Sequence, residues 1–154
     1  MRSEWEQVKL GDVIQPNLSS YSVNDKWNYV NYLDTGNITR NQIFEIQKID
    51  LHSEKLPSRA KRKVNKNSII YSTVRPNQRH YGIMSNIPDN FLVSTGFTVI
   101  DVNESKIDPY FIYYFLSLDS NVEHLHAVAE QSVSTYPSIN TSDIAKLEIC
   151  LPPL

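Results

Sequence analysis

The sequence has few cysteines and few glycines. Cys150 is the single cysteine among 154 residues, which excludes an internal disulfide framework and a cysteine-based zinc site and indicates a reducing compartment. The four glycines all stand apart from one another, so no glycine-rich loop is present to hold S-adenosylmethionine or a nucleotide. We therefore predict neither a bound cofactor nor a metal centre.

Long hydrophobic runs are also missing. No stretch of about 18 apolar residues occurs and no apolar segment follows Met1, so neither a membrane span nor a secretory signal is predicted. The 40% hydrophobic content suits one folded domain, and no repeat or internal linker divides the chain. We expect residues 1–154 to form a single cytoplasmic domain.

Acidic residues are absent from one long segment. No Asp or Glu lies between Glu54 and Asp89, yet residues 55–88 hold eight of the fifteen lysines and arginines. The segment carries +8 in a chain of net charge -2, so the rest of the chain carries -10. Binding depends on where charge lies on the surface rather than on its sum, which makes this segment a candidate surface for a polyanion.

Strand patterns fill the first two thirds of the chain, as runs of β-branched and aromatic residues bounded by turn residues. The predicted strands cover residues 29–33, 43–49, 68–75, 81–85 and 91–102, with a loop at 34–42. We expect 68–75 to be buried and to pair antiparallel with 81–85 across a loop that begins at Pro76. The last strand is expected to bend or bulge near Gly96.

Helix signals come late. Asp108 and Pro109 are typical of an N-cap and a first helical position, and the aromatic residues that follow are predicted to face the core rather than to stack on bases. The other expected elements are a short helix or turn over 5–14 packed by Trp5, a helix over 121–131, a turn at 144–147 capped by Thr141 or Ser142, and an apolar strand-like end. Strands precede helices, so the predicted class is α+β: a mixed, strongly twisted sheet with a few helices packed on it.

The basic segment offers two kinds of DNA contact. Lysine and arginine neutralise phosphates and release counterions, which we predict for Arg59, Lys61, Arg62, Lys63 and Lys66. Arginine, asparagine and glutamine read base edges in the major groove, which we predict for the loop residues Arg75, Asn77, Gln78, Arg79, His80 and Tyr81. The alternatives are a solvated charged loop and an ordinary polar hairpin.

A second polar run, residues 130–136, is a further candidate for a DNA-facing loop. The residues we predict to contact DNA there are Gln131, Ser132 and Ser134. We rank this run below the basic segment.

Two short patterns raise enzymatic alternatives. DPYF at 108–111 resembles the amino-methyltransferase motif, but tyrosine replaces its second proline and a helix cap explains the remainder. Pro88 and Asp89, followed by Glu104 and Lys106, fit the loose nuclease pattern in which carboxylates hold Mg²⁺. Chance matches to so short a pattern are common, so no catalytic residue is predicted.

Five segments in order carry a family resemblance. WEQVKLGDVI, VNKNSIIYSTVRPNQR, LVSTGFTVID, DPYFIYYFL and INTSDIAKLEICLPPL together resemble the target recognition domain of type I restriction-modification specificity subunits. The resemblance implies a non-catalytic domain that reads one half of a split double-stranded DNA site. It also implies methylation and restriction subunits as partners, the former supplying S-adenosylmethionine chemistry on adenine.

The chain departs from that family at its end. The family's LPPL segment leads into a long spacer helix, whereas Leu154 is the last residue here. We therefore expect a recognition domain lacking its spacer, either shortened or from a half-length relative, and assembly without that helix is in question. The alternative functions are a basic-faced protein-interaction module and, third, a Mg²⁺-dependent nuclease.

Overall fold

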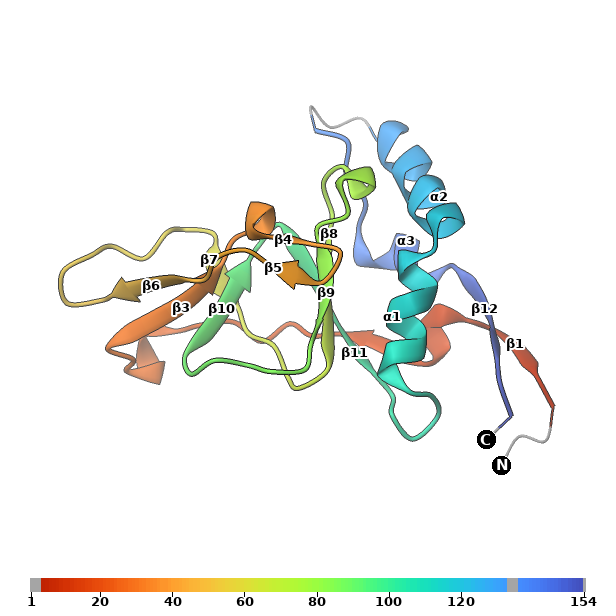
Figure 1. The fold of residues 1–154 in the computed structure, drawn as a ribbon, viewed down its shortest axis with the longest axis horizontal. Coiled ribbons are helices and arrows are strands. Elements are labelled where there is room, and N and C mark those ends of the chain that lie inside the picture. Colours follow the sequence, from red (N-terminus) through yellow and green to blue (C-terminus); the bar gives the residue numbers. More distant parts are fainter. Residues whose placement is uncertain (1–3, 133–135, 154) are drawn as a thin grey trace.

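The computed structural model describes residues 4–132 and 136–153. Their strands build two four-stranded sheets, with the helices gathered on one side of the second sheet (Figure 1). The first sheet has the order β6 (Gln47–Asp50), β3 (Tyr29–Leu33), β10 (Phe91–Ser94) and β7 (Ala60–Arg62). The second has the order β2 (Ile14–Pro16), β11 (Phe97–Val102), β8 (Ser68–Ser72) and β9 (Tyr81–Met84).

Smaller elements complete the fold. Two ribbons pair β1 (Glu6–Lys9) with β12 (Glu148–Leu151) and β4 (Ile38–Thr39) with β5 (Gln42–Ile43). The α-helices are α1 (Pro109–Ser117), α2 (Asp119–Glu130) and α3 (Thr141–Ala145). Short 3-10 helices are η1 (Leu10–Asp12), η2 (Val23–Asp25), η3 (Thr35–Asn37) and η4 (Pro76–Gln78).

The two sheets differ in strand direction. In the first sheet, β10 runs parallel to β3, and the remaining neighbours are antiparallel. Every pairing in the second sheet is antiparallel. The fold is therefore α+β with a mixed sheet, as the order of strand and helix signals predicts.

Strand β8 is buried along its whole length because both of its faces pack against other elements. Ile69 and Tyr71 join the apolar cluster beneath the helices, whereas Ile70, on the opposite face, joins the cluster between the two sheets. The predicted antiparallel pairing of β8 with β9 is confirmed, with Ser68 opposite Met84 and Tyr71 opposite Tyr81.

The predicted single strand over 91–102 is divided. The chain leaves the first sheet at Ser94, the end of β10, and enters the second at Phe97, the start of β11. Gly96 therefore lies where the chain crosses from one sheet to the other, rather than at a bulge within one strand. The consequence is that residues 95–96 link the two sheets.

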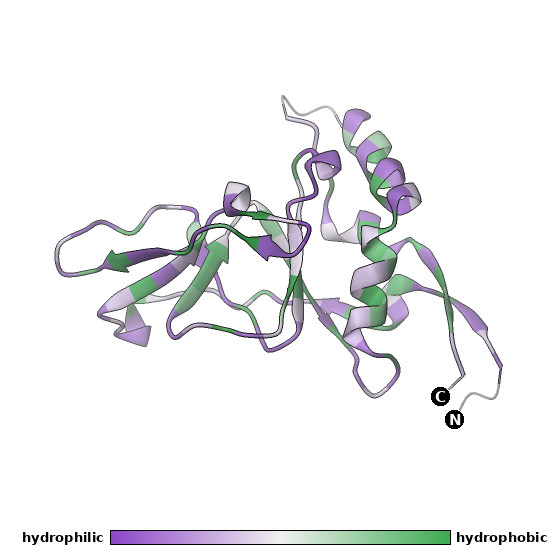
Figure 2. Ribbon diagram, in the orientation of Figure 1, coloured by the Kyte–Doolittle hydropathy of each residue, from purple (hydrophilic) through white to green (hydrophobic). Residues whose placement is uncertain are grey.

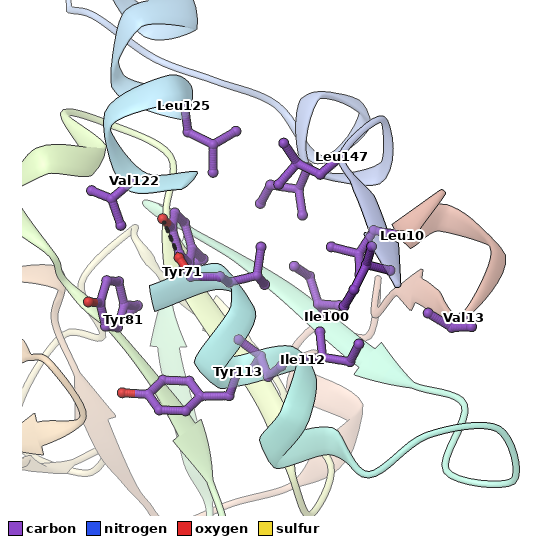
Figure 3. Packing of buried hydrophobic residues seen from close by; sticks show 14 of the residues in the cluster. Leu10, Val13, Tyr71, Tyr81, Ile100, Ile112, Tyr113, Val122, Leu125 and Leu147 are labelled. Atoms are coloured by element: carbon purple, nitrogen blue, oxygen red, sulfur yellow. Dashed lines mark hydrogen bonds between the residues drawn. The ribbon is translucent and has the colours of Figure 1, made fainter. Parts of the chain in front are cut away.

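The largest apolar cluster lies between the helices and the second sheet (Figure 3). Tyr81 is only 2% exposed there, with its ring stacked 5.3 Å from Tyr71 and edge-on 5.9 Å from Tyr113. The Tyr71 hydroxyl donates to the Leu116 carbonyl over 3.2 Å (Figure 3). Burial raises the pKa of Tyr71, and it raises that of Tyr113 to about 12.

Helix α1 begins as predicted, since the Asp108 carboxylate accepts a hydrogen bond from the Tyr110 N–H over 2.9 Å. The aromatic residues of α1 are divided between the core and the surface. Tyr113 is buried, Phe111 and Phe115 are half-buried, and Tyr114 is exposed. The prediction that they all face the core is therefore correct only for one side of the helix.

Three local predictions are wrong. Residues 5–14 begin as strand β1 and continue as η1, and Trp5 is exposed rather than packed. Strand β1 pairs with β12, so its conformation depends on a partner at the other end of the chain. The cap of α3 is Asn140, whose side chain accepts from the Asp143 N–H, rather than Thr141 or Ser142. Cys150 lies in an apolar run, where a buried structural cysteine is expected, but it is exposed, because burial alternates along β12.

The β4–β5 hairpin packs over β9 at Gly82. A Cβ atom at that position would lie 2.6 Å from Ile38 Cδ1 and 2.7 Å from Asn41 Oδ1. The hairpin turn consists of Arg40 and Asn41, both with positive φ, and their N–H groups donate to the carbonyls of Arg79 and Tyr81. These bonds place the hairpin beside the loop that contains η4, where hydrophilic residues gather (Figure 2).

Candidate nucleic-acid interface

A cavity of about 590 Å³ opens beside the crossing between the two sheets. It brings together four residues that the sequence predicts to contact DNA, namely Arg59, Arg75, Gln78 and His80. The other lining residues are Thr35, Gly36, Ser72, Val74, Gly96 and Tyr136. Two arginines and no carboxylate therefore line the cavity within the part of the chain that the structure describes.

Arg59 lies at the wall of the cavity, against Gly96. A Cβ atom at position 96 would lie 2.6 Å from Arg59 Nη2 and 2.8 Å from Thr35 Oγ1. The Arg59 carbonyl accepts a hydrogen bond from the Thr95 N–H over 2.9 Å. The backbone and the guanidinium of Arg59 therefore both lie against the turn formed by Thr95 and Gly96. Among residues 4–132 and 136–153, Arg59 has no ion-pair partner.

Arg75 begins the η4 loop on the opposite side of the cavity. Its backbone is left-handed, with φ of 46°, a conformation that costs a non-glycine residue about 1–2 kcal/mol. The carbonyl of Arg75 accepts from the Gln78 N–H, and its own N–H donates to the Pro137 carbonyl, both over 3.0 Å. Its guanidinium lies 5.5 Å from the centre of the Tyr136 ring, which holds the charge at the cavity's edge.

His80 presents a defined nitrogen to the cavity. Its Nδ1 lies 2.7 Å from the Ile38 carbonyl oxygen, and a carbonyl can only accept, so Nδ1 carries the proton. In the neutral ring Nε2 is then a hydrogen-bond acceptor. In that neutral form, His80 can supply an acceptor beside two arginines that only donate.

Arg79 and Tyr81, two further residues of the predicted DNA-contacting set, make contacts within the protein. Arg79 Nη2 lies 2.8 Å from an Asp119 carboxylate oxygen, and the side chain is 14% exposed. Its hydrogen bond with the Tyr81 hydroxyl, followed by the Asp119 charge, raises the pKa of Arg79. Arg79 therefore joins the loop to the helices, and Tyr81 belongs to the core.

The basic cluster before β8 does not form one surface. Lys61 is exposed on β7, whereas the neighbouring Arg62 faces a separate hollow of about 250 Å³ that Thr73 and Thr95 also line. Successive residues of a strand point to opposite faces, which explains the division. The Arg62 Nε is buried there with no hydrogen-bond partner among the described residues.

Lys63 and Lys66 lie away from the cavity as well. Lys63 Nζ is 2.9 Å from an Asp25 carboxylate oxygen and 5.3 Å from the Trp27 ring centre. The hydrogen bond from Lys63, and then that from the Ser22 N–H, lowers the pKa of Asp25. Lys66 is exposed just before β8, next to the Met84 end of β9, whereas Arg75 follows the other end of β8. The eight cations therefore do not make one continuous ridge.

The remaining predicted residues lie around the same loop. Asn77 is exposed on η4, which packs against α2. Gln131 is exposed just after α2, and the Ser132 hydroxyl is buried without a partner among the described residues. Ser134 lies outside the described residues.

Sequence reasoning missed several residues near this site. Thr35, Gly36 and Gly96 line the cavity, and Arg40 is exposed at the tip of the neighbouring hairpin. The Arg-Asn pair at 40–41 in a polar loop was a usable signal for a two-residue hairpin turn, because asparagine tolerates left-handed angles. No local signal indicated Gly96, since its role depends on Arg59, which is distant in sequence.

The structure supplies no cluster for metal-dependent chemistry. Within the described residues, no group of three or more His, Cys, Asp and Glu side chains gathers closely enough to hold a metal ion. Glu104 and Lys106 lie in the turn between β11 and α1. Across the same residues, no helix is both long and apolar enough to cross a membrane.

Comparison with known proteins decides the family. The family model described as "Type I restriction modification DNA specificity domain" matches residues 2–154. The chain belongs to this family. A similar curated protein is the type I restriction enzyme HindI specificity subunit of Haemophilus influenzae, 29% identical over 150 residues. The match covers 97% of this specificity domain and 32% of the relative, so the domain spans about a third of that protein.

Solved structures share the fold of the specificity domain. The HsdS subunit from Thermoanaerobacter tengcongensis matches with a TM-score of 0.81 and 26% identity, over 99% of this chain and 39% of that one. A chain from a study of complex assembly and conformational transition of the type I R-M system matches with a TM-score of 0.78 and 27% identity. That match covers 98% of the specificity domain and 38% of the solved chain.

Proposed function

We propose that the specificity domain binds double-stranded DNA sequence-specifically, as the recognition module of a type I restriction-modification complex. It directs a partner adenine methyltransferase and endonuclease to one half-site and contributes no catalytic group itself. The observation that carries this proposal is the cavity, which two arginines and no carboxylate line among the described residues, in a family of DNA specificity domains. In this proposal residues 1–154 act as one recognition domain, in the cytoplasm.

The contacts divide into anchoring and reading. Arg59 and Arg75 neutralise backbone phosphates, which supplies affinity for any duplex and a steep dependence on salt. Gln78 and His80 face the same cavity, and Asn77 lies beside them on η4. Their amide and imidazole groups test base edges, which supplies the sequence preference.

The partners follow from the similar proteins. One matching chain comes from work on complex assembly of the type I R-M system, and the curated relative is a specificity subunit of a restriction enzyme. The proposed partners are therefore methylation and restriction subunits. The other segments of a full-length subunit are expected to take part in that assembly, because the domain accounts for 32% of the curated relative.

Selection of bound duplexes from a randomised pool tests the proposal. Sequence-specific binding predicts enrichment of a motif a few base pairs long. Arg59→Ala should weaken binding to random and enriched duplexes alike, whereas Gln78→Ala should chiefly relax the motif. The matched control is Lys9→Ala, which removes an exposed cation from β1, a strand that contributes no residue to the cavity lining.

Two results would contradict the proposal. Selection that enriches no motif would argue against sequence-specific reading. An equal loss of affinity in Lys9→Ala and Arg59→Ala would mean that net charge, and not the cavity, governs binding.

A further inference from the structure

Gly96 occupies a cavity position where an added Cβ atom would meet a predicted DNA contact. A Cβ atom there would lie 2.6 Å from Arg59 Nη2, which is closer than side-chain atoms normally approach. Its φ is not in the left-handed region, since no glycine among the described residues has positive φ. Space for the guanidinium, and not backbone conformation, is therefore what this position requires.

The backbone at Gly96 is held by its neighbours and cannot yield. Its N–H donates to the Ser94 hydroxyl over 3.0 Å. Its carbonyl accepts from the Thr73 N–H over 3.0 Å and from the Thr73 hydroxyl over 3.2 Å. A methyl group added at position 96 would therefore push away the flexible end of Arg59 rather than move the turn.

Arg59 depends on this fit because little else fixes its guanidinium. Its carbonyl bond to the Thr95 N–H anchors the backbone, but within the described ranges its side chain has no hydrogen bond or ion pair. A long, exposed side chain loses conformational freedom when it binds, and a surface that holds it in place beforehand reduces that cost. The wall formed by Gly96 and Thr35 is that surface.

Resting on the proposed function, we infer that Gly96 is a positioning residue: it leaves the space in which the Arg59 guanidinium lies at the cavity wall and contacts a backbone phosphate of the duplex. The ligand class is a phosphodiester, because an arginine held against a wall meets a strand that passes over the cavity instead of reaching into a groove. Such a contact adds affinity without sequence preference.

The chain supplies a matched pair of glycine substitutions. Gly96→Ala adds a methyl group that meets Arg59, whereas Gly36→Ala adds one in the same cavity with nothing within 4 Å. The binding of random-sequence duplex is measured against salt concentration for both variants, for Arg59→Ala, and for Gly96→Ala combined with Arg59→Ala. Thermal unfolding of each variant reports whether it is folded.

The expected pattern is specific to positioning. Gly96→Ala should reproduce most of the affinity loss of Arg59→Ala, about three- to tenfold. It should also make the negative slope of log K against log salt shallower by about 0.9, the value for one phosphate contact. The double variant should bind no more weakly than Arg59→Ala, and Gly36→Ala, whose added methyl group leaves Arg59 in place, should keep the wild-type salt slope. Arg59→Lys, with Gly96 intact, should bind more weakly than the wild type with an unchanged slope, because an ammonium group keeps the charge but not the planar fork.

The outcomes separate this inference from the proposed function. Unchanged binding in Arg59→Ala would remove the cavity from the DNA surface. A loss in Arg59→Ala that Gly96→Ala does not share, or a further loss in the double variant, would overturn the role of Gly96 and leave the DNA surface standing. A loss confined to one duplex sequence at constant slope would overturn the phosphate assignment. If Gly96→Ala does not fold, Arg59→Lys decides, and wild-type affinity in that variant would reject positioning.

Discussion

Arg75 and Arg79 stand at the two ends of η4, and both have left-handed backbones, with φ of 46° and 58°. Arg75 is exposed at the cavity, where its charge is met by the face of Tyr136. Arg79 is mostly buried and bound to Asp119 at the start of α2. The difference lies in the neighbouring element, because α2 places a carboxylate beside one arginine and the cavity places none beside the other.

The comparison distinguishes an arginine paired with a carboxylate from one without such a partner, a difference that the sequence alone does not reveal. A cation paired inside the protein holds elements together, and its charge is largely cancelled at the surface. A cation without a carboxylate neighbour remains available to a polyanion. Substitutions on the helix side of the loop should therefore affect stability, and those on the cavity side should affect binding.

The largest effect is expected in the core on the helix side. Tyr81→Ala should lower the free energy of unfolding by about 3–5 kcal/mol, the range for removing a large buried aromatic side chain. Urea denaturation measures this change. Tyr136→Ala, at a position 59% exposed, is the control on the cavity side and should cost less than about 1 kcal/mol. Similar losses in the two variants would remove the distinction between the two sides.

The next effect is on affinity. Arg75→Ala should weaken binding to every duplex about tenfold at low salt, equivalent to about 1.4 kcal/mol, and lower the salt slope by about 0.9. Fluorescence anisotropy with labelled random duplex measures both quantities. Stability should stay within about 0.5 kcal/mol of the wild type. A stable variant with unaltered affinity would remove Arg75 from the DNA surface.

A smaller effect is expected for the arginine on the helix side. Arg79→Ala should lower the free energy of unfolding by about 0.5–1 kcal/mol, because Asp119 is 78% exposed and solvent weakens the pair. Asp119→Asn should show a similar loss, and the two together should be less than additive. The salt slope of DNA binding should not change. A slope reduced as strongly as in Arg75→Ala would show that Arg79 also contacts phosphate.

The smallest effect depends on pH. Interaction with Lys63 lowers the pKa of Asp25 below its ordinary 3.8, so the contribution is present above that pH and is lost as pH falls through the lower, folded-state value. Asp25→Asn should therefore be less stable than the wild type near neutral pH, and the difference should vanish in strong acid. Urea midpoints at a series of pH values measure it. A constant difference across that series would refute the linkage.

Local signals were sufficient for much of the fold. The strands predicted at 68–75 and 81–85 are observed as β8 over 68–72 and β9 over 81–84, and their pairing was predicted because a short loop separates them. The start of α1 was predicted from Asp108 and Pro109, because this helix cap involves only residues that are neighbours in the sequence. The strand at 6–9 was not predicted, since its partner lies at 148–151 and its apolar spacing also fits a helical turn.

The candidate site was also predictable only where it depends on residues close together in the sequence. Composition located Arg59, Arg75, Gln78 and His80, but it could not separate them from Arg79, because Asp119 is forty residues away. The direction of Arg62 depended on strand β7, which the sequence did not predict. Proximity in sequence thus identified the segment that contributes Arg59, Arg75, Gln78 and His80 to the cavity, and pairing distant in sequence determined which of its side chains have partners within the protein.

The ribbon of β1 and β12 joins the first and last strands side by side (Figure 1). Polypeptide leading into β1 and polypeptide leaving β12 would therefore meet at one corner of the fold, far from the cavity. A longer protein can contain such a unit as an inserted domain that another domain can replace, because the replacement leaves the path of the flanking chain unchanged. New recognition properties can then be acquired by swapping the whole unit, without rebuilding the scaffold that holds it.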